Sequence, residues 1–179
     1  VVGAFGYAAV TADGGRSWQK TKISRGEYAD QHLYNIFAGP KGALWVAAEG
    51  GTVFRSVDDG ISFEAVPLPY KGSIWGGLVL RDGAVLVWGM RGHVLRSGDG
   101  GRTWTDVPSG TQQALTTGLQ LAGDEIVIAG LGGAVVRSRD GGRSFAAQIR
   151  PERQSHTALV EAGDALITFT LAGIGGGIN

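Results

Sequence analysis

Four aspartates at nearly equal spacing are the most regular titratable residues in this chain of 179 residues. Asp13, Asp58, Asp99 and Asp140 lie 45, 41 and 41 residues apart, each at the third position of an octet. Carboxylates are common acids and bases in hydrolytic enzymes, so a repeated aspartate is a candidate for that chemistry. An aspartate can also accept hydrogen bonds from the N–H groups of a tight turn in which glycine supplies a positive φ. Because all four octets carry that pattern, we expect their aspartates to stabilise turns rather than to catalyse.

The octets read TADGGRSW, SVDDGISF, SGDGGRTW and SRDGGRSF. Their first hydroxyl is expected to close the turn, and their last aromatic to begin the next strand facing the core. The arginines inside the octets are expected to be exposed. The residues with this structural role are Asp13, Gly15, Trp18, Asp58, Gly60, Phe63, Asp99, Gly101, Trp104, Asp140, Gly142 and Phe145.

Arginine recurs just before three of the octets, at Arg55, Arg96 and Arg137. Such an array could bind carboxylates through bidentate hydrogen bonds. It could equally pair with acidic groups of the neighbouring repeat, and the first repeat lacks the arginine. We favour the structural role, because every repeat of a regular fold needs the same joint.

The histidines do not suggest a metal site. His32, His93 and His156 lie far apart without an HxH or HExxH pattern, and the chain has no cysteine. We therefore predict neither a metal nor a cofactor. His156 is expected to face a water-filled central channel, and the glycine-rich residues 130–135 are expected to form a turn rather than a phosphate loop.

The repeat period near 40 residues predicts how these side chains are positioned. A period of this length made of strand-like segments is typical of a β-propeller with one blade per repeat. Each blade should contain strands A to D, and strand B is apolar enough for burial on both faces. We predict a single partial propeller domain, 1–179, with blades at 1–23 (partial), 31–68, 72–108, 112–150 and 155–179 (partial).

The two terminal blades are expected to be incomplete, so the all-β chain should form three complete four-stranded blades within a ring of six or seven. Strand A is missing from the first blade, and the last has only A and B. The tail AGIGGGIN departs from the repeat and is expected to be an edge or a frayed end. Val1 aligns with mid-strand residues, which predicts a natural N-terminus upstream.

The octets follow the pattern SxDxGx[ST][WF], which resembles the Asp-box of the bacterial neuraminidase repeat. That repeat occurs in sialidases and in many propellers that are not enzymes. The segments VFRS, VLRS and VVRS before the octets make the wider repeat similar to the photosystem II assembly-factor family of bacterial proteins. This resemblance implies a non-catalytic scaffold that binds a protein partner.

In a propeller, the B-to-C turns and the loops that follow strand D share one edge of the blades, here called the loop edge. The A-to-B turns and octets share the other, the octet edge. Loops 24–32, 67–73, 109–113 and 150–155 therefore form the candidate binding surface. Its mixture of aromatic and charged side chains suits a protein or peptide. The candidate partner-binding residues are Arg25, Glu27, Tyr28, His32, Glu49, Tyr70, Lys71, Arg91, His93 and Arg153.

A sialidase-like glycoside hydrolase is the alternative function. Sialidases as a family use an arginine triad, a tyrosine nucleophile with a glutamate partner, and an Arg-Ile-Pro motif, which this chain lacks. Glycoside hydrolysis requires two carboxylates across the sugar, and Glu27, Asp30 and Glu49 lie on suitable loops. We expect the protein not to be an enzyme.

The overall charge does not favour a polyanionic partner. Sixteen basic and sixteen acidic side chains cancel, so no net field should attract nucleic acid or an anionic membrane. No apolar run is long enough to span a bilayer. The absence of cysteine fits an exported protein, and we expect an extracytoplasmic location in the bacterial periplasm.

Overall fold

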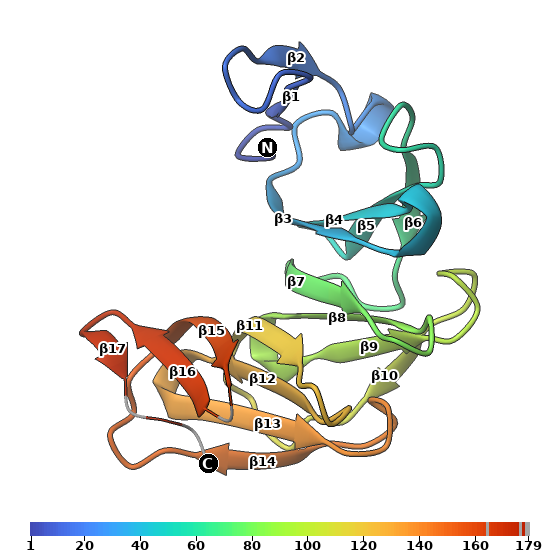
Figure 1. Ribbon diagram of the computed structural model, residues 1–179. Coiled ribbons are helices and arrows are strands. Elements are labelled where there is room, and N and C mark those ends of the chain that lie inside the picture. Colours follow the sequence, from blue (N-terminus) through green and yellow to red (C-terminus); the bar gives the residue numbers. More distant parts are fainter. Residues whose placement is uncertain (164, 176, 178–179) are drawn as a thin grey trace. The chain divides into compact units, whose positions relative to one another are not determined.

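The computed structural model describes residues 1–163, 165–175 and 177, which form antiparallel sheets connected by short turns (Figure 1). The chain divides into two compact units, Val1–Ile74 and Trp75–Asn179. None of the helices in the described residues is long and apolar enough to cross a membrane. These helices are single 3-10 turns: η1 (Gly26–Tyr28), η2 (Pro40–Gly42), η3 (Met90–Gly92) and η4 (Leu131–Gly133).

The first unit contains two sheets. The first sheet pairs β1 (Ala8–Val10) with β2 (Gln19–Thr21). The second sheet has the order β3-β4-β5-β6. Its strands are β3 (Leu33–Ala38), β4 (Leu44–Ala48), β5 (Thr52–Ser56) and β6 (Glu64–Pro67).

Three further sheets follow. The third sheet contains β7 (Ile74–Val79), β8 (Val85–Gly89), β9 (Val94–Ser97) and β10 (Thr105–Val107). The fourth contains β11 (Leu115–Gln120), β12 (Ile126–Gly130), β13 (Ala134–Ser138) and β14 (Ala146–Ile149). The fifth contains β15 (His156–Ala162), β16 (Ala165–Thr170) and β17 (Gly173–Gly175).

The fold is that of a β-propeller, as predicted, and each sheet is one blade. The second, third and fourth sheets have four strands in chain order. The fifth sheet corrects one expectation, because β17 adds a third strand antiparallel to β16. In the first sheet, Val2 forms an isolated bridge to Ala8 where a strand B was expected. The ring size and the blade boundaries remain predictions.

Apolar side chains of the B and C strands form the cores. In the second unit, Leu86 and Trp88 of the third sheet pack with Ile126, Ile128 and Val136 of the fourth. Each fully buried aliphatic side chain of this kind contributes about 1.5–3 kcal/mol. This burial joins the third and fourth sheets into one body and holds their edge loops in fixed positions.

A second core joins the fourth and fifth sheets, where Val127, Ala129 and Val135 pack with Leu159 and Leu166. In the first unit, Ala8 and Ile23 pack against Leu33, Val46 and Phe54 of the second sheet. Within each unit, the neighbouring sheets are therefore joined by apolar contacts.

The innermost strands carry a bulge at an equivalent position, since the pairing register shifts past Tyr34, Thr116 and Thr157. The Thr116 hydroxyl donates to the carbonyl of His156 at 2.6 Å and so ties the fourth sheet to the fifth. The His156 side chain is only 5% exposed. It therefore does not face a water-filled channel, contrary to our expectation.

Candidate functional site

The octet aspartates make the turn contacts that the sequence predicts. In the third sheet, Asp99 Oδ1 accepts from the Ser97 hydroxyl at 2.8 Å and the Thr103 N–H at 2.9 Å. Its Oδ2 accepts from the Thr103 hydroxyl at 2.6 Å. Ser97 Oγ in turn accepts from the Gly101 N–H at 2.8 Å. The carboxylate is thus surrounded by donors that stabilise its charged form.

These donors lower the pKa of every octet aspartate, and the largest cause in each is a side-chain hydroxyl. For Asp13 and Asp58 the pKa falls to about 2, through the hydroxyls of Ser17 and Ser62 respectively. A carboxyl group with such a pKa is ionised near neutral pH and holds no proton to donate. A structural role therefore explains the octet aspartates better than general acid catalysis.

The octet aromatics are less buried than expected. Phe63 and Phe145 pack partly buried against their cores. Trp104 is half-buried and donates its indole N–H to the Gly101 carbonyl at 3.1 Å. Trp18 is 48% exposed. The octet aromatics therefore face the core only in part. In the third sheet, the indole of Trp104 also contacts its own octet turn.

The recurring arginines contact protein groups, but the acidic partner of each lies in its own sheet and not in the neighbouring repeat, contrary to our expectation. Arg96 Nε donates to the Gly141 carbonyl in the octet of the fourth sheet at 2.8 Å, and its side chain is 15% exposed. Arg96 also forms an ion pair of 3.3 Å with Asp82. In the first unit, Arg55 lies over the Trp45 ring and pairs with Glu64 at 3.3 Å.

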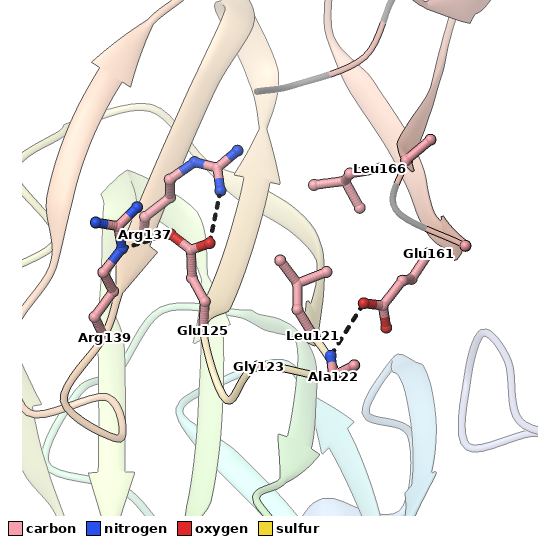
Figure 2. A pocket seen from close by; sticks show the side chains of 10 residues that line it. Leu121, Ala122, Gly123, Glu125, Arg137, Arg139, Glu161 and Leu166 are labelled. Atoms are coloured by element: carbon pink, nitrogen blue, oxygen red, sulfur yellow. Dashed lines mark hydrogen bonds and ion pairs between the residues drawn. The ribbon is translucent and has the colours of Figure 1, made fainter.

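A hollow of about 640 Å³ lies between the fourth and fifth sheets at their octet edge (Figure 2). Glu125 pairs there with Arg137 at 3.2 Å and with Arg139 at 3.1 Å. Glu161 Oε1 accepts from the Ala122 N–H at 3.0 Å. The two guanidinium groups are thus paired with Glu125, and the Glu161 carboxylate is bound to a backbone N–H group.

The repeat explains this hollow. Arg137 is in register with Arg96, which contacts the octet of the next sheet at Gly141. Beside that contact, Leu86 packs so closely that a Cβ on Gly142 would lie 2.9 Å from it. The described residues of the fifth sheet contain no octet that could make the same contact with Arg137. We therefore interpret this hollow as a surface for contact between neighbouring blades and not as the candidate functional site.

The loop edge has a different feature, a B-to-C turn with two successive left-handed residues. Glycine fills both positions in the second and fourth sheets, whereas Phe5 and Arg91 take the first position in the first and third sheets. A side chain in this conformation is strained by about 1–2 kcal/mol. Strained residues cluster at functional sites. The pairs are Phe5 and Gly6, Gly50 and Gly51, Arg91 and Gly92, and Gly132 and Gly133.

Arg91 lines a hollow of about 390 Å³ at the loop edge of the third sheet. Nearby, His93 Nδ1 and Asp106 Oδ2 lie 2.9 Å apart. Gly92 packs so tightly that a Cβ there would lie 2.1 Å from the Thr111 carbonyl oxygen. The full lining is Arg91, Gly92, His93, Asp106, Val107, Pro108, Ser109, Gly110, Thr111 and Gln112. Charged, hydroxyl and amide groups thus line this hollow, and its wall is tightly packed at Gly92. We call this the third-sheet hollow.

The first sheet has a corresponding hollow of about 560 Å³ in the first unit, called here the first-sheet hollow. Phe5 and Tyr7 of the B-to-C turn line it together with Lys20, Lys22 and Arg25. Of the predicted partner-binding residues, only Arg25 lies there, and Asp30, a candidate carboxylate for glycoside hydrolysis, also lines this hollow. The remaining lining residues are Gly6, Ala8, Thr21, Ser24 and Ala29.

Other predicted residues of the first unit lie beside the second sheet. His32 lies between the rings of Phe5 and Tyr34, at centroid distances of 4.6 and 6.3 Å. Its backbone N–H donates to Glu49 Oε1 at 2.9 Å. Tyr28 packs edge-on against Phe54 in the core, and this contact gives it a structural role.

The remaining predicted residues are divided among three turns. Glu27 forms part of η1 and raises the pKa of Tyr28 by hydrogen bonding and by its charge. The carbonyl of Tyr70, next to Lys71, meets Gly51 of the second-sheet turn so closely that no Cβ would fit. Arg153, with φ 47°, packs with its backbone on the corresponding fourth-sheet turn. Arg153 does not line the third-sheet hollow.

Sequence reasoning missed several lining residues, which are Phe5, Tyr7, Lys20, Lys22 and Asp106. A signal for two of the strained positions was present, because Phe5 and Arg91 stand where Gly50 and Gly132 occur in the other repeats. No cluster of three His, Asp or Glu side chains suited to a metal occurs among the described residues.

Comparison with solved structures identifies the class of protein. The fold of this chain is shared with β-propellers of several kinds, and 95 solved chains match it. Neither a family model nor a curated protein matches the chain. Since the solved structures considered below are under 20% identical to the chain, their similarity shows the fold alone.

A structure described as YCF48 bound to D1 peptide has a TM-score of 0.72 and 18% identity, over 94% of this chain and 55% of that one. The catalytically inactive virginiamycin B lyase from Staphylococcus aureus with quinupristin gives 0.77 and 19%, over 94% and 57%. The NanB sialidase from Streptococcus pneumoniae gives 0.64 and 17%, over 92% and 32%. The chain thus spans little more than half the length of the first two. The predicted resemblance to Asp-box and assembly-factor propellers is confirmed at the level of the fold.

Proposed function

We propose that the protein is a non-catalytic β-propeller that binds a protein or peptide partner at its loop edge. The observation that carries this proposal is the strained Arg91, which stands at a left-handed turn position and lines the third-sheet hollow. Glycine would relieve the strain, so the arginine side chain is retained at the expense of stability. A residue that lowers the stability of the protein in this way is expected where its side chain has a function, for example in binding.

The chemistry of the third-sheet hollow suits a peptide. The Arg91 guanidinium can donate bidentate hydrogen bonds to a carboxylate or to backbone carbonyls. The Thr111 hydroxyl and the amide of Gln112 add donors and acceptors around it, whereas the buried Ser109 hydroxyl donates to the Thr111 carbonyl. YCF48, which has the same fold, has been solved with a D1 peptide, and this precedent supports peptide binding by such a propeller. We also propose an extracytoplasmic, periplasmic location.

Partner capture by the immobilised protein, followed by mass spectrometry, tests the proposal. The variant Arg91→Glu/Arg153→Glu is expected to lose capture at least about tenfold, because it reverses two exposed charges at the loop edge, one in the third sheet and one beside the fourth-sheet turn. The matched control is Arg16→Glu, an exposed charge reversal on the first octet. A partner captured equally by all three proteins, with unchanged melting temperatures, would contradict binding at this edge.

Glycoside hydrolysis is the competing function, because the NanB sialidase shares the fold and Glu49 lies on a suitable loop. Fluorogenic glycosides, including a sialoside, are expected to give no turnover. Turnover that disappears in Glu49→Gln or Glu27→Gln would replace the binding proposal by an enzymatic one.

A further inference from the structure

The first-sheet hollow is more basic than its counterpart in the third sheet. The repeat puts Lys20 where the third sheet has Asp106, and Tyr7 where it has His93. In the third sheet, His93 and Asp106 form a contact of 2.9 Å. In the first sheet, the same two positions carry an aromatic ring and an ammonium group. The two hollows therefore have a similar backbone but different charge.

Three cations line the first-sheet hollow against a single carboxylate. Lys20, Lys22 and Arg25 are all exposed, and Asp30 is the one acidic side chain in the lining. Lys20 is the middle residue of β2, Lys22 directly follows that strand, and both line the hollow. No ion pair joins any of these four side chains to another group in the described part of the chain. The hollow therefore has an excess of unpaired positive charge.

The walls of this hollow are built rigidly. The Gly6 N–H donates to the Gln31 carbonyl at 2.9 Å, and the Ser24 hydroxyl donates to the Ala29 carbonyl at 3.2 Å. A Cβ on Gly6 would lie 2.2 Å from the Ala29 oxygen, so the turn and the loop are in close contact. A preformed wall reduces the entropy lost when a ligand binds.

The aromatic side of the hollow is exposed. Phe5 is 73% exposed and Tyr7 is 47% exposed. The φ of 52° holds Phe5 in a conformation that bulky residues rarely adopt. An exposed aromatic held in a strained turn beside three cations offers an apolar contact next to an anion-binding surface.

We infer that the first-sheet hollow binds an acidic peptide segment, whose carboxylates contact Lys20, Lys22 and Arg25 and whose apolar side chain packs on Phe5. Its volume of about 560 Å³ is suited to a few side chains. Charge complementarity selects carboxylate groups over a neutral peptide. This inference goes beyond the proposed function, because it concerns another sheet and does not depend on Arg91 or Arg153.

Fluorescence anisotropy with a fluorescein-labelled peptide of glutamates around one phenylalanine tests the inference on the whole chain. The matched probe replaces every glutamate by glutamine. We expect the glutamate peptide to bind at least about tenfold more tightly than the glutamine peptide, and to weaken as salt is added. Equal affinity for the two peptides would overturn the inference.

Variants locate the site. Lys20→Gln/Lys22→Gln is expected to raise the Kd of the glutamate peptide about tenfold, whereas Arg16→Gln, outside the hollow, should leave it unchanged. Phe5→Gly removes both the ring and its strain, so binding should weaken although the melting temperature does not fall. An unchanged Kd in the lysine variant would contradict binding of the peptide in the first-sheet hollow. Tighter binding of a labelled oligothymidylate than of the glutamate peptide would also contradict the inference. The proposed function would stand after either result, since capture is measured through Arg91 and Arg153.

Discussion

The octet aspartates illustrate how one residue type acquires a structural role from its neighbours. Asp58 accepts from the Ser56 hydroxyl at 2.7 Å, the Ser62 N–H at 3.0 Å and the Ser62 hydroxyl at 2.6 Å. Hydrogen bonds to the ionised form lower the pKa to about 2, with the Ser62 hydroxyl as the largest cause. The turn is therefore most stable when the carboxylate is charged.

Asp58→Asn should destabilise the protein at neutral pH, because an amide nitrogen in place of Oδ2 cannot accept the hydrogen bond of the Ser62 hydroxyl. The folded pKa is depressed, so the stabilisation is present above the unfolded pKa near 4 and is lost as the pH falls towards 2. Urea midpoints of parent and variant should therefore differ near neutral pH and converge in acid. A difference between the two urea midpoints that does not change with pH would contradict a stabilising role of the charged carboxylate.

Some side-chain environments could be predicted from the sequence and others could not. The turn contacts of the aspartates could be predicted because donor and acceptor lie within a few residues of one another. The burial of His156 could not, because it depends on packing at a joint between sheets. Burial lowers the pKa of this histidine, with Arg150 as a further cause. Lys20 and Lys22 were missed because only the folded loop edge brings them beside Phe5.

At the scale of elements, the B-to-C turn links backbone strain to the candidate surface. The turn needs two left-handed residues, and Arg91 occupies the first with φ 55°. Glycine at the same position in two other repeats shows that the turn does not need a side chain there. This comparison supports our proposal that the arginine serves binding at the surface.

Arg91→Gly is expected to raise the free energy of unfolding by about 0.5–1 kcal/mol, because glycine adopts a positive φ without steric strain. Partner capture should weaken in the same variant. Arg91→Lys retains both charge and strain and provides the control, with unchanged stability. Urea denaturation measures the effect, and a loss of stability in Arg91→Gly would show that the side chain supports the fold.

Most strands could be predicted because apolar runs and turns recur at a fixed period. β17 was missed because Gly173, Ile174 and Gly175 lack the apolar pattern of the other C strands. It pairs with β16 through its backbone, which does not depend on side chains, and Ile174 stays 77% exposed. Periodicity predicts strands held by core packing better than strands held by hydrogen bonds alone.

At the scale of the whole molecule, we propose separate roles for the octets and the loop edge. Arg96 joins the third sheet to the octet of the fourth through the Gly141 carbonyl, whereas Arg55 and Arg137 form ion pairs within their own sheets. The left-handed residues Phe5 and Arg91 line hollows at the loop edge of the first and third sheets. Positive φ also occurs at the octet edge, at Lys41, Asp59 and Asp124. The sequence could predict this division, because the repeat assigns each loop to an edge of its sheet. It could not predict which repeats carry a hollow.

Hydrogen exchange of the protein, alone and with its captured partner, tests binding at the loop edge most directly. We predict that the partner slows exchange in segments 91–93 and 106–112, which line the third-sheet hollow, and leaves exchange in the octets at 97–104 and 138–145 unchanged. Slower exchange confined to the octets, with no change at 91–93 and 106–112, would contradict it.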